Sequence, residues 1–354
     1  MSVRVALIGY GLGGSVFHAP LIAATPGLEL AAVVTRDPAR RAALENDFPA
    51  ARAFGDADTL FADARNFDLV VIASPNATHE LLARRALDAG LNVVIDKPFA
   101  ATASGAQALI DRATARRLLV IPFQNRRWDG DFLTVRRLVA DGPLGEILHF
   151  ESRMERWRPI AKPRWTTATA AAEVEGIIYD LGSHLVDQAL VLFGPAARVY
   201  AEADARGAGV TVDDDSLIAI THRSGVRSRI VVSTNVAIPG PRFSVAGRRG
   251  TFVKFGVDPQ EEALKSGRRP GKEPGSEPWG EEDSVAWGTL HDGTSAARVR
   301  TEAGAYGSFY AGVEEALVRG GPPPVDSHDA VRSLAVLEAA LQSAANARVV
   351  EIPA

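Results

Sequence analysis

Residues 3–20 read VRVALIGYGLGGSVFHAP, in which an apolar run leads directly into a turn that is rich in glycine. Gly9, Gly11 and Gly14 have the spacing G-x-G-x-x-G. In that motif the first glycine permits a tight turn, the second lets a pyrophosphate approach the backbone, and the third allows close helix packing. Glycine-rich turns also join strands to helices without any ligand, so the surrounding pattern has to decide between the two.

The first third of the chain alternates apolar runs with amphipathic stretches, which is typical of β-α-β units around a parallel sheet. Five runs have the near-continuous apolar character of buried parallel strands: VRVALIG, LELAAVVTR, DLVVIAS, NVVIDK and RLLVIPF. Residues 79–90 and 104–117 carry apolar side chains at helical spacing, and Gly90 is the expected C-cap of the first of these helices. The glycine motif therefore follows a strand and opens a helix, which favours a dinucleotide-binding turn.

After residue 123 the pattern changes to runs that alternate polar and apolar residues, as in strands with one exposed face. These runs are EILHFESRMERW, RVYAEADA, SLIAITH, RSRIVVSTN and GTFVKFG. Helices are expected at 131–142, 307–321 and 329–346, and a surface loop at 258–283, which is rich in Gly, Pro, Glu and Lys. The predicted fold class is α/β, with an N-terminal Rossmann doubly wound parallel sheet and a C-terminal α+β domain that has a large open, mainly antiparallel sheet. The expected domain bounds are 1–123 and 124–354.

The composition excludes several classes of function. The chain has 354 residues, enough for two domains, and its 39 Lys and Arg against 43 Asp and Glu leave a formal net charge of −4. Because the two signs are interspersed, neither a nucleic acid nor an anionic membrane is favoured as a partner. The absence of cysteine excludes disulfides, thiolate nucleophiles and cysteine-bound metals. No signal peptide or membrane-spanning run is recognisable, so we expect a soluble cytoplasmic protein.

The end of the second predicted strand bears on the choice of dinucleotide. Sites for NAD usually carry an acidic residue there, which binds the ribose 2′-hydroxyl. This chain has Thr35 and Arg36 instead, and Asp37 is better explained as the N-cap of a helix that begins at Pro38. A guanidinium pairs well with a 2′-phosphate, so Arg36 favours NADP over NAD. The alternative is a solvated arginine in a loop.

Five further motifs follow the glycine turn in order: FHAP, SPNATH, DKPF, FQNRRW and YDLGSHLVDQAL. Together with that turn they make the whole chain resemble the Gfo/Idh/MocA oxidoreductase family. The resemblance implies a Rossmann domain that binds a nicotinamide cofactor and a second domain that holds the substrate and forms oligomers. It also implies hydride transfer at a secondary hydroxyl of a sugar or an inositol. The run NRRWDGDFLTVRRL resembles the branch that contains NADP-preferring scyllo-inositol dehydrogenases. One departure is visible, because the family's Glu-Lys-Pro reads Asp96-Lys97-Pro98 here.

The resemblance and the glycine motif together imply a set of cofactor-binding residues. These are Gly9, Gly11, Leu12, Gly13, Gly14, Thr35, Arg36, Ser74, Pro75, Asn76, His79, Asp96, Lys97, Pro98, Asn125 and Arg126. Gln124 is a further candidate for contact with the cofactor or the substrate. A structural alternative for the SPNATH segment is that Asn76 or Thr78 only caps the following helix.

Lys97, Asp180 and His184 are the expected catalytic residues. Lys97 follows a buried strand, at the sheet edge where ligands of open α/β sheets bind, so its ammonium can stabilise charge on a substrate oxygen. Asp180 and His184 are four residues apart, which on a helix places them on one face, and histidine is well suited to proton transfer near neutral pH. Gly182 between them suggests a close approach of a ligand or of backbone.

Two tryptophans and an acidic run complete the candidates. Trp157 and Trp165 are expected to contact the substrate together with Lys97, Asp180 and His184, although packing explains either tryptophan taken singly. The consecutive carboxylates Asp213, Asp214 and Asp215 are predicted to form a solvated turn, and no metal site is expected.

Two other classes of function stay open alongside a dehydrogenase of sugars or inositols. One is a non-catalytic NAD(P)-sensing regulator, and the other is a glycosidase that uses NAD and returns it unchanged. A third possibility is the reduction of an aromatic dihydrodiol or a bilin, which needs a flatter and more apolar pocket than the arginine-rich segment 153–164 suggests. The alternating strands of the second domain leave a sheet face available, so a homodimer or homotetramer formed through the C-terminal sheet is expected.

Overall fold

The structure is a computed structural model that describes residues 2–160, 163–166, 174–271 and 278–353. The chain divides into two compact units. Unit 1 comprises residues 1–125, 260–279 and 305–331, and unit 2 comprises residues 126–259, 280–304 and 332–354. The domain bounds 1–123 and 124–354 stay a prediction, because the units are defined by backbone contacts and unit 1 also takes in two later segments.

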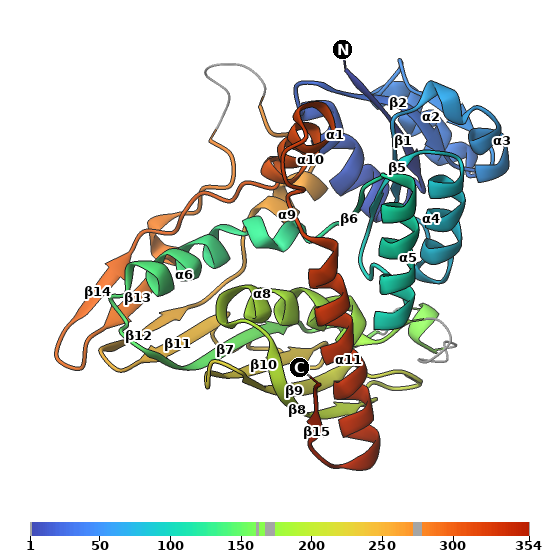
Figure 1. Cartoon of the computed structure of the whole chain (residues 1–354). Coiled ribbons are helices and arrows are strands. Elements are labelled where there is room, and N and C mark those ends of the chain that lie inside the picture. Colours follow the sequence, from blue (N-terminus) through green and yellow to red (C-terminus); the bar gives the residue numbers. More distant parts are fainter. Residues whose placement is uncertain (1, 161–162, 167–173, 272–277, 354) are drawn as a thin grey trace. The chain divides into compact units, whose positions relative to one another are not determined.

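Unit 1 contains a six-stranded sheet in the order β3-β2-β1-β4-β5-β6 (Figure 1). Its strands are β1 (Val3–Ile8), β2 (Leu28–Val34), β3 (Arg52–Phe54), β4 (Leu69–Ile72), β5 (Asn92–Ile95) and β6 (Val120–Pro122). All neighbouring pairs are parallel, and this is the order of a doubly wound dinucleotide-binding sheet. The five predicted strands are confirmed. Strand β3 was missed because its three residues carry no apolar run.

Helices cover both faces of this sheet. They are η1 (Gly13–His18), α1 (Ala19–Ala24), α2 (Pro38–Asp47), α3 (Ala57–Ala62), η2 (Ala64–Asn66), η3 (Asn76–Thr78), α4 (His79–Asp88), α5 (Ala103–Arg116), α9 (Gln260–Lys265) and α10 (Gly307–Arg319). Helices α4 and α5 pack against each other on one side, and α1 packs against α10 on the other (Figure 1). Asp37 caps α2 by accepting hydrogen bonds from the amides of Ala39 and Arg40, as predicted. Gly90 follows α4 with φ +82°, as its predicted role requires.

The prediction of a loop at 258–283 is wrong in part, because helix α9 lies within it. Gln260 and Leu264 of this helix are buried. The Gln260 Oε1 atom accepts hydrogen bonds from the Trp279 indole at 2.9 Å and from the Tyr306 amide at 2.8 Å. A buried amide side chain anchors the segment, so its low apolar content concealed the helix.

Unit 2 contains a nine-stranded sheet in the order β14-β13-β12-β11-β7-β10-β9-β8-β15. Its strands are β7 (Ile147–Glu155), β8 (Ala196–Asp204), β9 (Asp215–His222), β10 (Arg227–Ser233), β11 (Phe243–Gly247), β12 (Gly250–Lys254), β13 (Gly288–His291), β14 (Ala296–Val299) and β15 (Val350–Glu351). Only the β7–β10 pair is parallel, so the predicted mainly antiparallel sheet is confirmed. Strands β11, β13, β14 and β15 were missed because they are short and weakly patterned.

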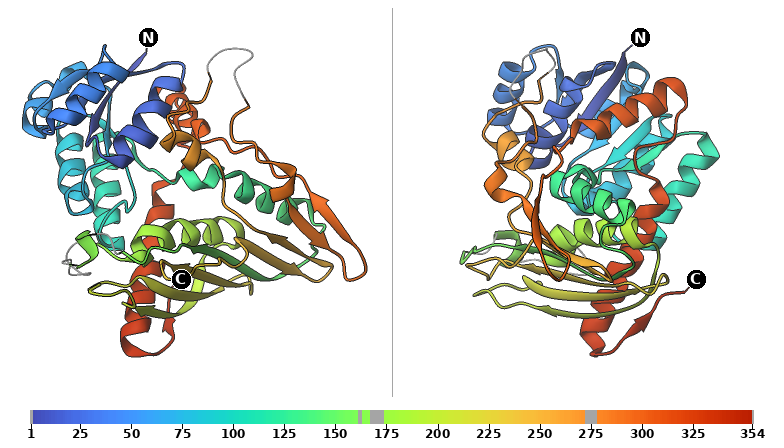
Figure 2. Two further views of the ribbon diagram at one scale, coloured as in Figure 1. Left: turned by 180° about the vertical axis from the view of Figure 1, so that it is seen from behind. Right: turned by 90° about the vertical axis from the view of Figure 1, so that its left-hand side faces the viewer.

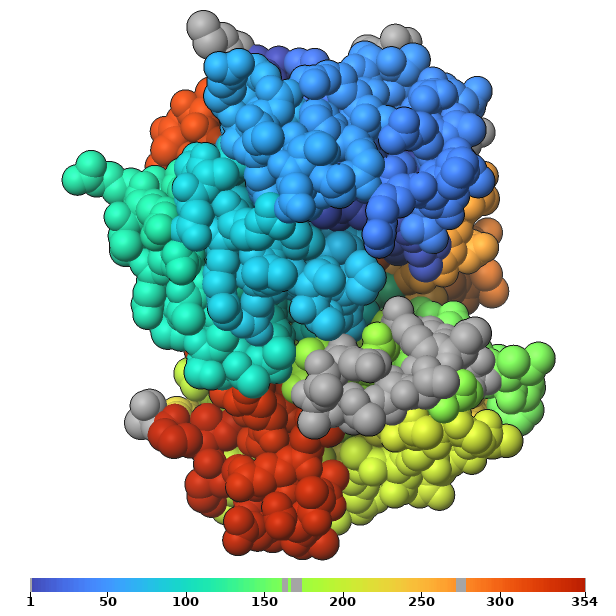
Figure 3. All heavy atoms as spheres, turned by 90° about the vertical axis from the view of Figure 1, so that its right-hand side faces the viewer, coloured from blue at the N-terminus to red at the C-terminus, as the bar shows by residue number. Residues whose placement is uncertain are grey.

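One face of this sheet is covered by helices, as Figure 2 shows. The remaining helical segments among the described residues are η4 (Asn125–Trp128), α6 (Gly130–Asp141), η5 (Pro163–Thr166), η6 (Ile178–Gly182), α8 (Ser183–Phe193), η7 (Ser284–Ala286) and α11 (Ser327–Asn346). Burial alternates along β9, which is the pattern of a strand with one covered face. At the edge of the sheet the C-terminal strand β15 pairs with β8, and Figure 3 shows red C-terminal residues next to yellow-green residues from the middle of the chain.

Helices α6, α10 and α11 confirm the three helices predicted after residue 123. In the part of the chain that the structure describes, no helix combines the length and the apolar character that crossing a membrane requires.

Candidate active site

The glycine turn after β1 is built as a cradle. Gly9 has φ +101°, and a Cβ there would lie 2.5 Å from the carbonyl oxygen of Ala73, in the loop after β4. A Cβ on Gly14 would lie 2.0 Å from the carbonyl oxygen of Gly9. At Gly11 the nearest atom is a guanidinium nitrogen of Arg40 at 3.7 Å, which leaves the backbone open. Packing within the protein thus requires Gly9 and Gly14, whereas Gly11 leaves the space that a pyrophosphate needs.

The chain passes from this turn directly into η1, a π-helical turn that continues into α1. The first amides of a helix have no partner within the helix and carry partial positive charge, so they suit an anionic group. Leu12, which precedes η1, is 62% exposed beside them. The cradle, its amides and this apolar side chain fit a dinucleotide.

Near the end of β2, the first turn of α2 carries a basic residue, Arg40, that the sequence reasoning missed. Thr35 is buried and Arg36 is exposed, as a residue that contacts a ligand at this edge requires. The guanidinium of Arg40 lies beside Gly11, and its Nε is 3.5 Å from the carboxylate of Asp37. The sequence did contain a signal for Arg40, namely a second arginine four residues after Arg36.

His79 ties the loop after β4 to the loop after β5. Its ring is buried, with Nε2 2.8 Å from the Ser74 carbonyl oxygen and Nδ1 2.8 Å from the Pro98 carbonyl oxygen. The Thr78 hydroxyl donates to the Pro75 carbonyl at 2.7 Å and makes no capping bond to α4. The structure therefore does not support the alternative that Thr78 caps this helix, and it places SPNATH against DKPF.

Asp96 stands between the glycine turn and Lys97. Its Oδ1 accepts a hydrogen bond of 2.7 Å from the Lys97 amide, and its Oδ2 is 3.4 Å from Nε2 of His18. Burial raises the pKa of Asp96, but His18, His79 and Lys97 outweigh it, so the pKa is lowered. Asp96 is therefore an anion beside the cradle, and Lys97 follows it at the carboxyl edge of the sheet.

Asp180 and His184 lie on consecutive helical segments of unit 2. Asp180 belongs to the π-helical turn η6, and His184 is a buried residue in the first turn of α8. The two residues lie on one continuous helical stretch, and their placement on a single face stays a prediction. A Cβ on Gly182 would meet no atom closer than 3.8 Å, so the close backbone approach suggested for Gly182 is not found.

The comparisons with known proteins agree with this geometry. Residues 3–123 match the model of the oxidoreductase family with an NAD-binding Rossmann fold, and residues 132–253 match that of the GFO/IDH/MocA C-terminal domain. The uncharacterized oxidoreductase YdgJ of Escherichia coli strain K12 is 39% identical over 97% of this chain and 96% of its own length. The chain belongs to the Gfo/Idh/MocA family. It is an oxidoreductase of the NAD(P)-dependent dehydrogenase type.

Two further relatives match 99% or more of this Gfo/Idh/MocA chain. The scyllo-inositol 2-dehydrogenase (NADP(+)) IolW of Bacillus subtilis strain 168 is 30% identical over 99% of this chain and 96% of its own length. The solved structure described as the "YPO2259 putative oxidoreductase from Yersinia pestis" matches with a TM-score of 0.90 at 37% identity, over 100% of this chain and 98% of that one.

The acidic run of this Gfo/Idh/MocA chain is not the solvated turn that was predicted. Asp213 and Asp214 are buried because their carboxylates bind backbone amides. Asp213 accepts a hydrogen bond of 2.8 Å from the Ile178 amide, at the start of η6. Asp214 accepts from the amides of Arg206 and Gly207 at 2.8 and 2.9 Å. Burial raises the pKa of Asp213 to about 6, against the lowering effect of its hydrogen bonds.

The two candidate tryptophans have different surroundings. Trp165 is 2% exposed, and its indole donates to a carboxylate oxygen of Glu175 at 3.1 Å. Trp157 is 59% exposed and forms an isolated bridge with Asn235. Of the two, Trp157 has the more accessible ring, and Trp165 is buried in unit 2.

The segment FQNRRW is buried where it was expected to meet ligands. Gln124, Asn125 and Arg126 all have little exposed surface. A guanidinium nitrogen of Arg126 is 3.2 Å from the carboxylate of Asp129, and the carbonyl of Arg126 accepts a hydrogen bond of 2.8 Å from Gln188. These contacts hold Arg126 within unit 2.

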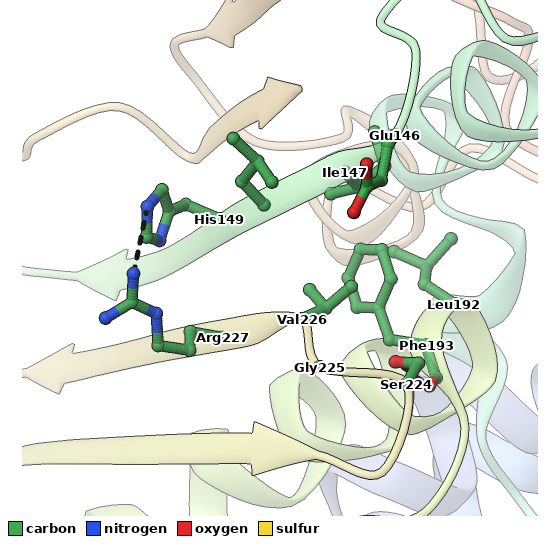
Figure 4. Close-up of a pocket in the computed structure, with 10 residues that line it drawn as sticks. Glu146, Ile147, His149, Leu192, Phe193, Ser224, Gly225, Val226 and Arg227 are labelled. Carbon is green, nitrogen blue, oxygen red and sulfur yellow. Dashed lines mark hydrogen bonds between the residues drawn. The ribbon is translucent and has the colours of Figure 1, made fainter. Parts of the chain in front are cut away.

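A cavity of about 430 Å³ lies in unit 2, where β7 and β10 begin (Figure 4). Phe193 at the end of α8 lines it, and one guanidinium nitrogen of Arg227 is 3.4 Å from His149 at its edge. His184 is nine residues earlier on the same helix, roughly 13 Å away along the axis. None of the predicted site residues lines this cavity.

Proposed function

We propose that the protein transfers a hydride between C4 of the nicotinamide of NADP and a secondary carbinol carbon of a cyclic polyol or sugar, with a scyllo-inositol-like ring as the substrate class. The observation that carries the proposal is the position of Asp96 and Lys97 at the edge of a cradle that fits a dinucleotide. A Cβ on Gly13 would lie 2.8 Å from a carboxylate oxygen of Asp96, so Asp96 packs against the glycine turn. Lys97 is the next residue in the chain and therefore begins beside that turn. The relative IolW, named for the same chemistry, supports the substrate class.

The chain's own residues divide the work. The amides of the glycine turn and η1 bind the pyrophosphate, and Ser74, Asn76 and Pro98 line the path toward the nicotinamide. When bound, the nicotinamide supplies or accepts the hydride. Lys97 donates a hydrogen bond to the reacting oxygen of the substrate and stabilises negative charge there.

Proton transfer falls to His184. Its imidazole accepts the hydroxyl proton when the alcohol is oxidised and returns it when the ketone is reduced. Asp180 orients the imidazole. Trp157 offers an aromatic face to the C–H side of the polyol.

We expect His184→Ala or Lys97→Ala to lower kcat by roughly a hundredfold or more with NADPH affinity retained. Near wild-type kcat in either variant would contradict the assignment.

Two features support NADP over NAD. Arg36 is exposed at the end of β2, and a second guanidinium, that of Arg40, lies beside Gly11. The carboxylate of Asp37 accepts hydrogen bonds from the amides of Ala39 and Arg40, so this acidic group is engaged in capping α2. Two guanidinium groups match the charge and the fork geometry of a 2′-phosphate.

The first test is a titration of the purified protein with NADPH and NADH, followed by the fluorescence of the bound cofactor. A screen of NADP reduction across inositols and aldoses follows. We expect tighter binding of NADPH and turnover on one cyclic polyol. Equal or better efficiency with NADH would contradict the NADP preference. Tight binding without turnover on any polyol or sugar would favour the regulator or the NAD-using glycosidase, which cleavage of aryl glycosides then distinguishes.

We also propose that the chain forms a homodimer or homotetramer through the sheet of unit 2. Residues on the face of β7 and β10 that points away from the core alternate in charge, with Glu151 and Glu155 beside Arg153 and Arg229. Such a face is complementary to itself when two copies are related by a twofold axis. Light scattering of the eluted protein, with Arg229→Glu as the disrupting variant, tests this arrangement.

A further inference from the structure

The histidine of FHAP has no role in the proposed reaction, yet it is held firmly inside unit 1. His18 is the last residue of η1 and is fully buried, at 0% exposure. Its Nδ1 lies 2.6 Å from the hydroxyl of Tyr310 on α10. Its ring packs against Phe123 with centroids 4.1 Å apart. An imidazole buried this completely has its hydrogen bonds dictated by the protein.

The donors and acceptors around His18 select one arrangement of protons. On its other side Nε2 faces the carboxylate of Asp96, which as an anion only accepts, so Nε2 carries the proton. In the neutral imidazole that this proton defines, Nδ1 is the acceptor and the Tyr310 hydroxyl donates to it. Burial raises the pKa of Tyr310 well above its ordinary value, so this hydroxyl keeps its proton. The three groups therefore form a directed chain from Tyr310 through His18 to Asp96.

The separation of 3.4 Å between Nε2 and Oδ2 is longer than an ordinary N–H···O bond, and among the described residues Nε2 has no other hydrogen-bond partner. The ring is thus aimed at the carboxylate with nothing else to bind. A shift of a few tenths of an ångström by Asp96 closes this contact.

The series of hydrogen bonds that starts at Tyr310 ends at the backbone of Lys97. While Oδ2 of Asp96 faces His18, Oδ1 accepts the hydrogen bond of the Lys97 amide at 2.7 Å. The carboxylate also occupies the space that any side chain at Gly13 would need, since a Cβ there would be 2.8 Å from Oδ2. This contact explains Gly13, a glycine outside the three positions of the motif. An aspartate that lost its contact on the Oδ2 side would gain other rotamers and release the Lys97 amide.

We propose that His18, held by Tyr310, is a positioning residue that fixes the carboxylate of Asp96 and, through it, the backbone of Lys97 at the cofactor cradle. The inference deepens the proposed function and rests on it for the role of Lys97 in the reaction. Because the side chain of His18 has no exposed surface, we assign it no direct contact with the substrate. His18 acts on the position of the Lys97 backbone, from which the side chain that carries the ammonium extends.

Three variants separate this role from packing. His18→Leu removes both ring nitrogens, His18→Gln keeps a side-chain N–H, and Tyr310→Phe keeps the ring but removes the donor to Nδ1. Phe309→Leu is the matched control, because Phe309 is equally buried on α10 and packs against Phe123 at 4.8 Å without belonging to the chain of hydrogen bonds. Tyr310→Phe also keeps the test valid if His18→Leu does not fold.

Two readouts are measured on each variant. The first readout is which of kcat, KM and the NADPH Kd changes, measured on each variant before its lysines are methylated. The second does not depend on turnover: the chain has only five lysines, so reductive ¹³C-methylation gives a simple NMR spectrum in which Lys97→Arg assigns the Lys97 resonance.

We expect His18→Leu to lower kcat roughly tenfold to a hundredfold, as a misplaced reacting group does. Tyr310→Phe lowers kcat about fivefold, the effect of one hydrogen bond. His18→Gln recovers most of the activity, and both damaging variants move the Lys97 resonance. Phe309→Leu lowers the melting temperature but leaves kcat and the resonance in place.

An unmoved Lys97 resonance in His18→Leu, or a fall in kcat with Phe309→Leu as large as with His18→Leu, would overturn the proposal in favour of simple packing. If the wild-type protein turns over no polyol, the proposed function fails by itself. In that case the resonance still decides whether His18 positions Lys97.

Discussion

Gly11 and Gly14 belong to one motif but are glycines for different reasons. The backbone of Gly9 leaves no room for a Cβ at Gly14, whereas only a guanidinium nitrogen lies near the place of a Cβ at Gly11. A methyl group at position 14 therefore strains the protein itself, and one at position 11 enters the space of the ligand.

This difference predicts opposite effects of two equivalent substitutions. We expect Gly14→Ala to lower the free energy of unfolding by about 1–3 kcal/mol, as overpacking does, and to lower the melting temperature without cofactor. Gly11→Ala should leave that temperature nearly unchanged and weaken NADPH binding roughly tenfold or more, through steric exclusion of the pyrophosphate. Differential scanning calorimetry and a fluorescence titration of both variants check the pair. Equal loss of stability in the two would contradict the division.

At the scale of elements, the end of β2 and the start of α2 form the edge that we propose selects the cofactor. Arg36 lies between the two elements, and Arg40 belongs to the first turn of α2, next to the capping carboxylate of Asp37. The cap fixes the direction of this turn and so the reach of Arg40 toward Gly11.

The arrangement predicts that both arginines contribute to NADPH binding. Arg36→Ala and Arg40→Ala should each weaken NADPH binding roughly tenfold, the size of one charge-assisted pair, and leave NADH binding nearly unchanged. Arg41→Ala on the next position of α2 is the control. Isothermal titration of each variant with both cofactors decides this, and an equal loss for NADH would show that the arginines do not bind the 2′-phosphate.

The turn η6 is a second element held by a side chain from elsewhere in the sequence. The carboxylate of Asp213 accepts from the Ile178 amide, and a Cβ on Gly176, which has φ +105°, would lie 2.0 Å from it. Asp213 thereby sets the start of the segment that carries Asp180. Its burial makes this contact dependent on pH.

Asp213 has an ordinary pKa of 3.8 and a pKa of about 6 in the folded protein. Because the folded state holds this proton more tightly than the unfolded state, the contribution of Asp213 to stability is present below pH 4. It is lost as the pH rises from about 4 to about 6.

The predicted size of this loss is about 3 kcal/mol at most, from 1.36 kcal/mol per pKa unit. Asp213→Asn keeps an acceptor for the Ile178 amide but does not titrate. The difference in unfolding free energy between wild type and Asp213→Asn should favour the wild type more at pH 4 than at pH 7. Denaturant unfolding of both proteins at the two pH values measures it, and a difference independent of pH would refute the assignment.

For the whole molecule, binding of the cofactor and folding are linked. Because a dinucleotide binds the folded cradle and not the unfolded chain, it stabilises the fold that contains the cradle. We expect NADPH at about a hundred times its Kd to raise the unfolding free energy by about 2.7 kcal/mol. Calorimetric scans with NADPH, with NADH at the same concentration, and of Arg36→Ala with NADPH measure this. The same shift from both cofactors would argue against a preference for NADP.

Much of this molecule was predictable because its signals are local. The alternation of apolar runs with amphipathic stretches predicted five of the six Rossmann strands, and the order of motifs predicted the family. The N-cap at Asp37 and the C-cap at Gly90 follow from the preferences of single residues. Such features depend on neighbours within a few positions, which a sequence displays directly.

What only the tertiary structure decided are contacts between segments far apart in the chain. The pairing of His18 with Tyr310 spans 292 positions, and Gln260 anchors a helix inside a stretch that reads as a loop. Asp213 and Asp214 look solvated in sequence, but backbone amides from other segments satisfy them in the interior. Hydrogen bonds from backbone amides far away in the sequence lower the free-energy cost of burying a charged carboxylate. Composition and residue spacing do not show which amides will supply those bonds.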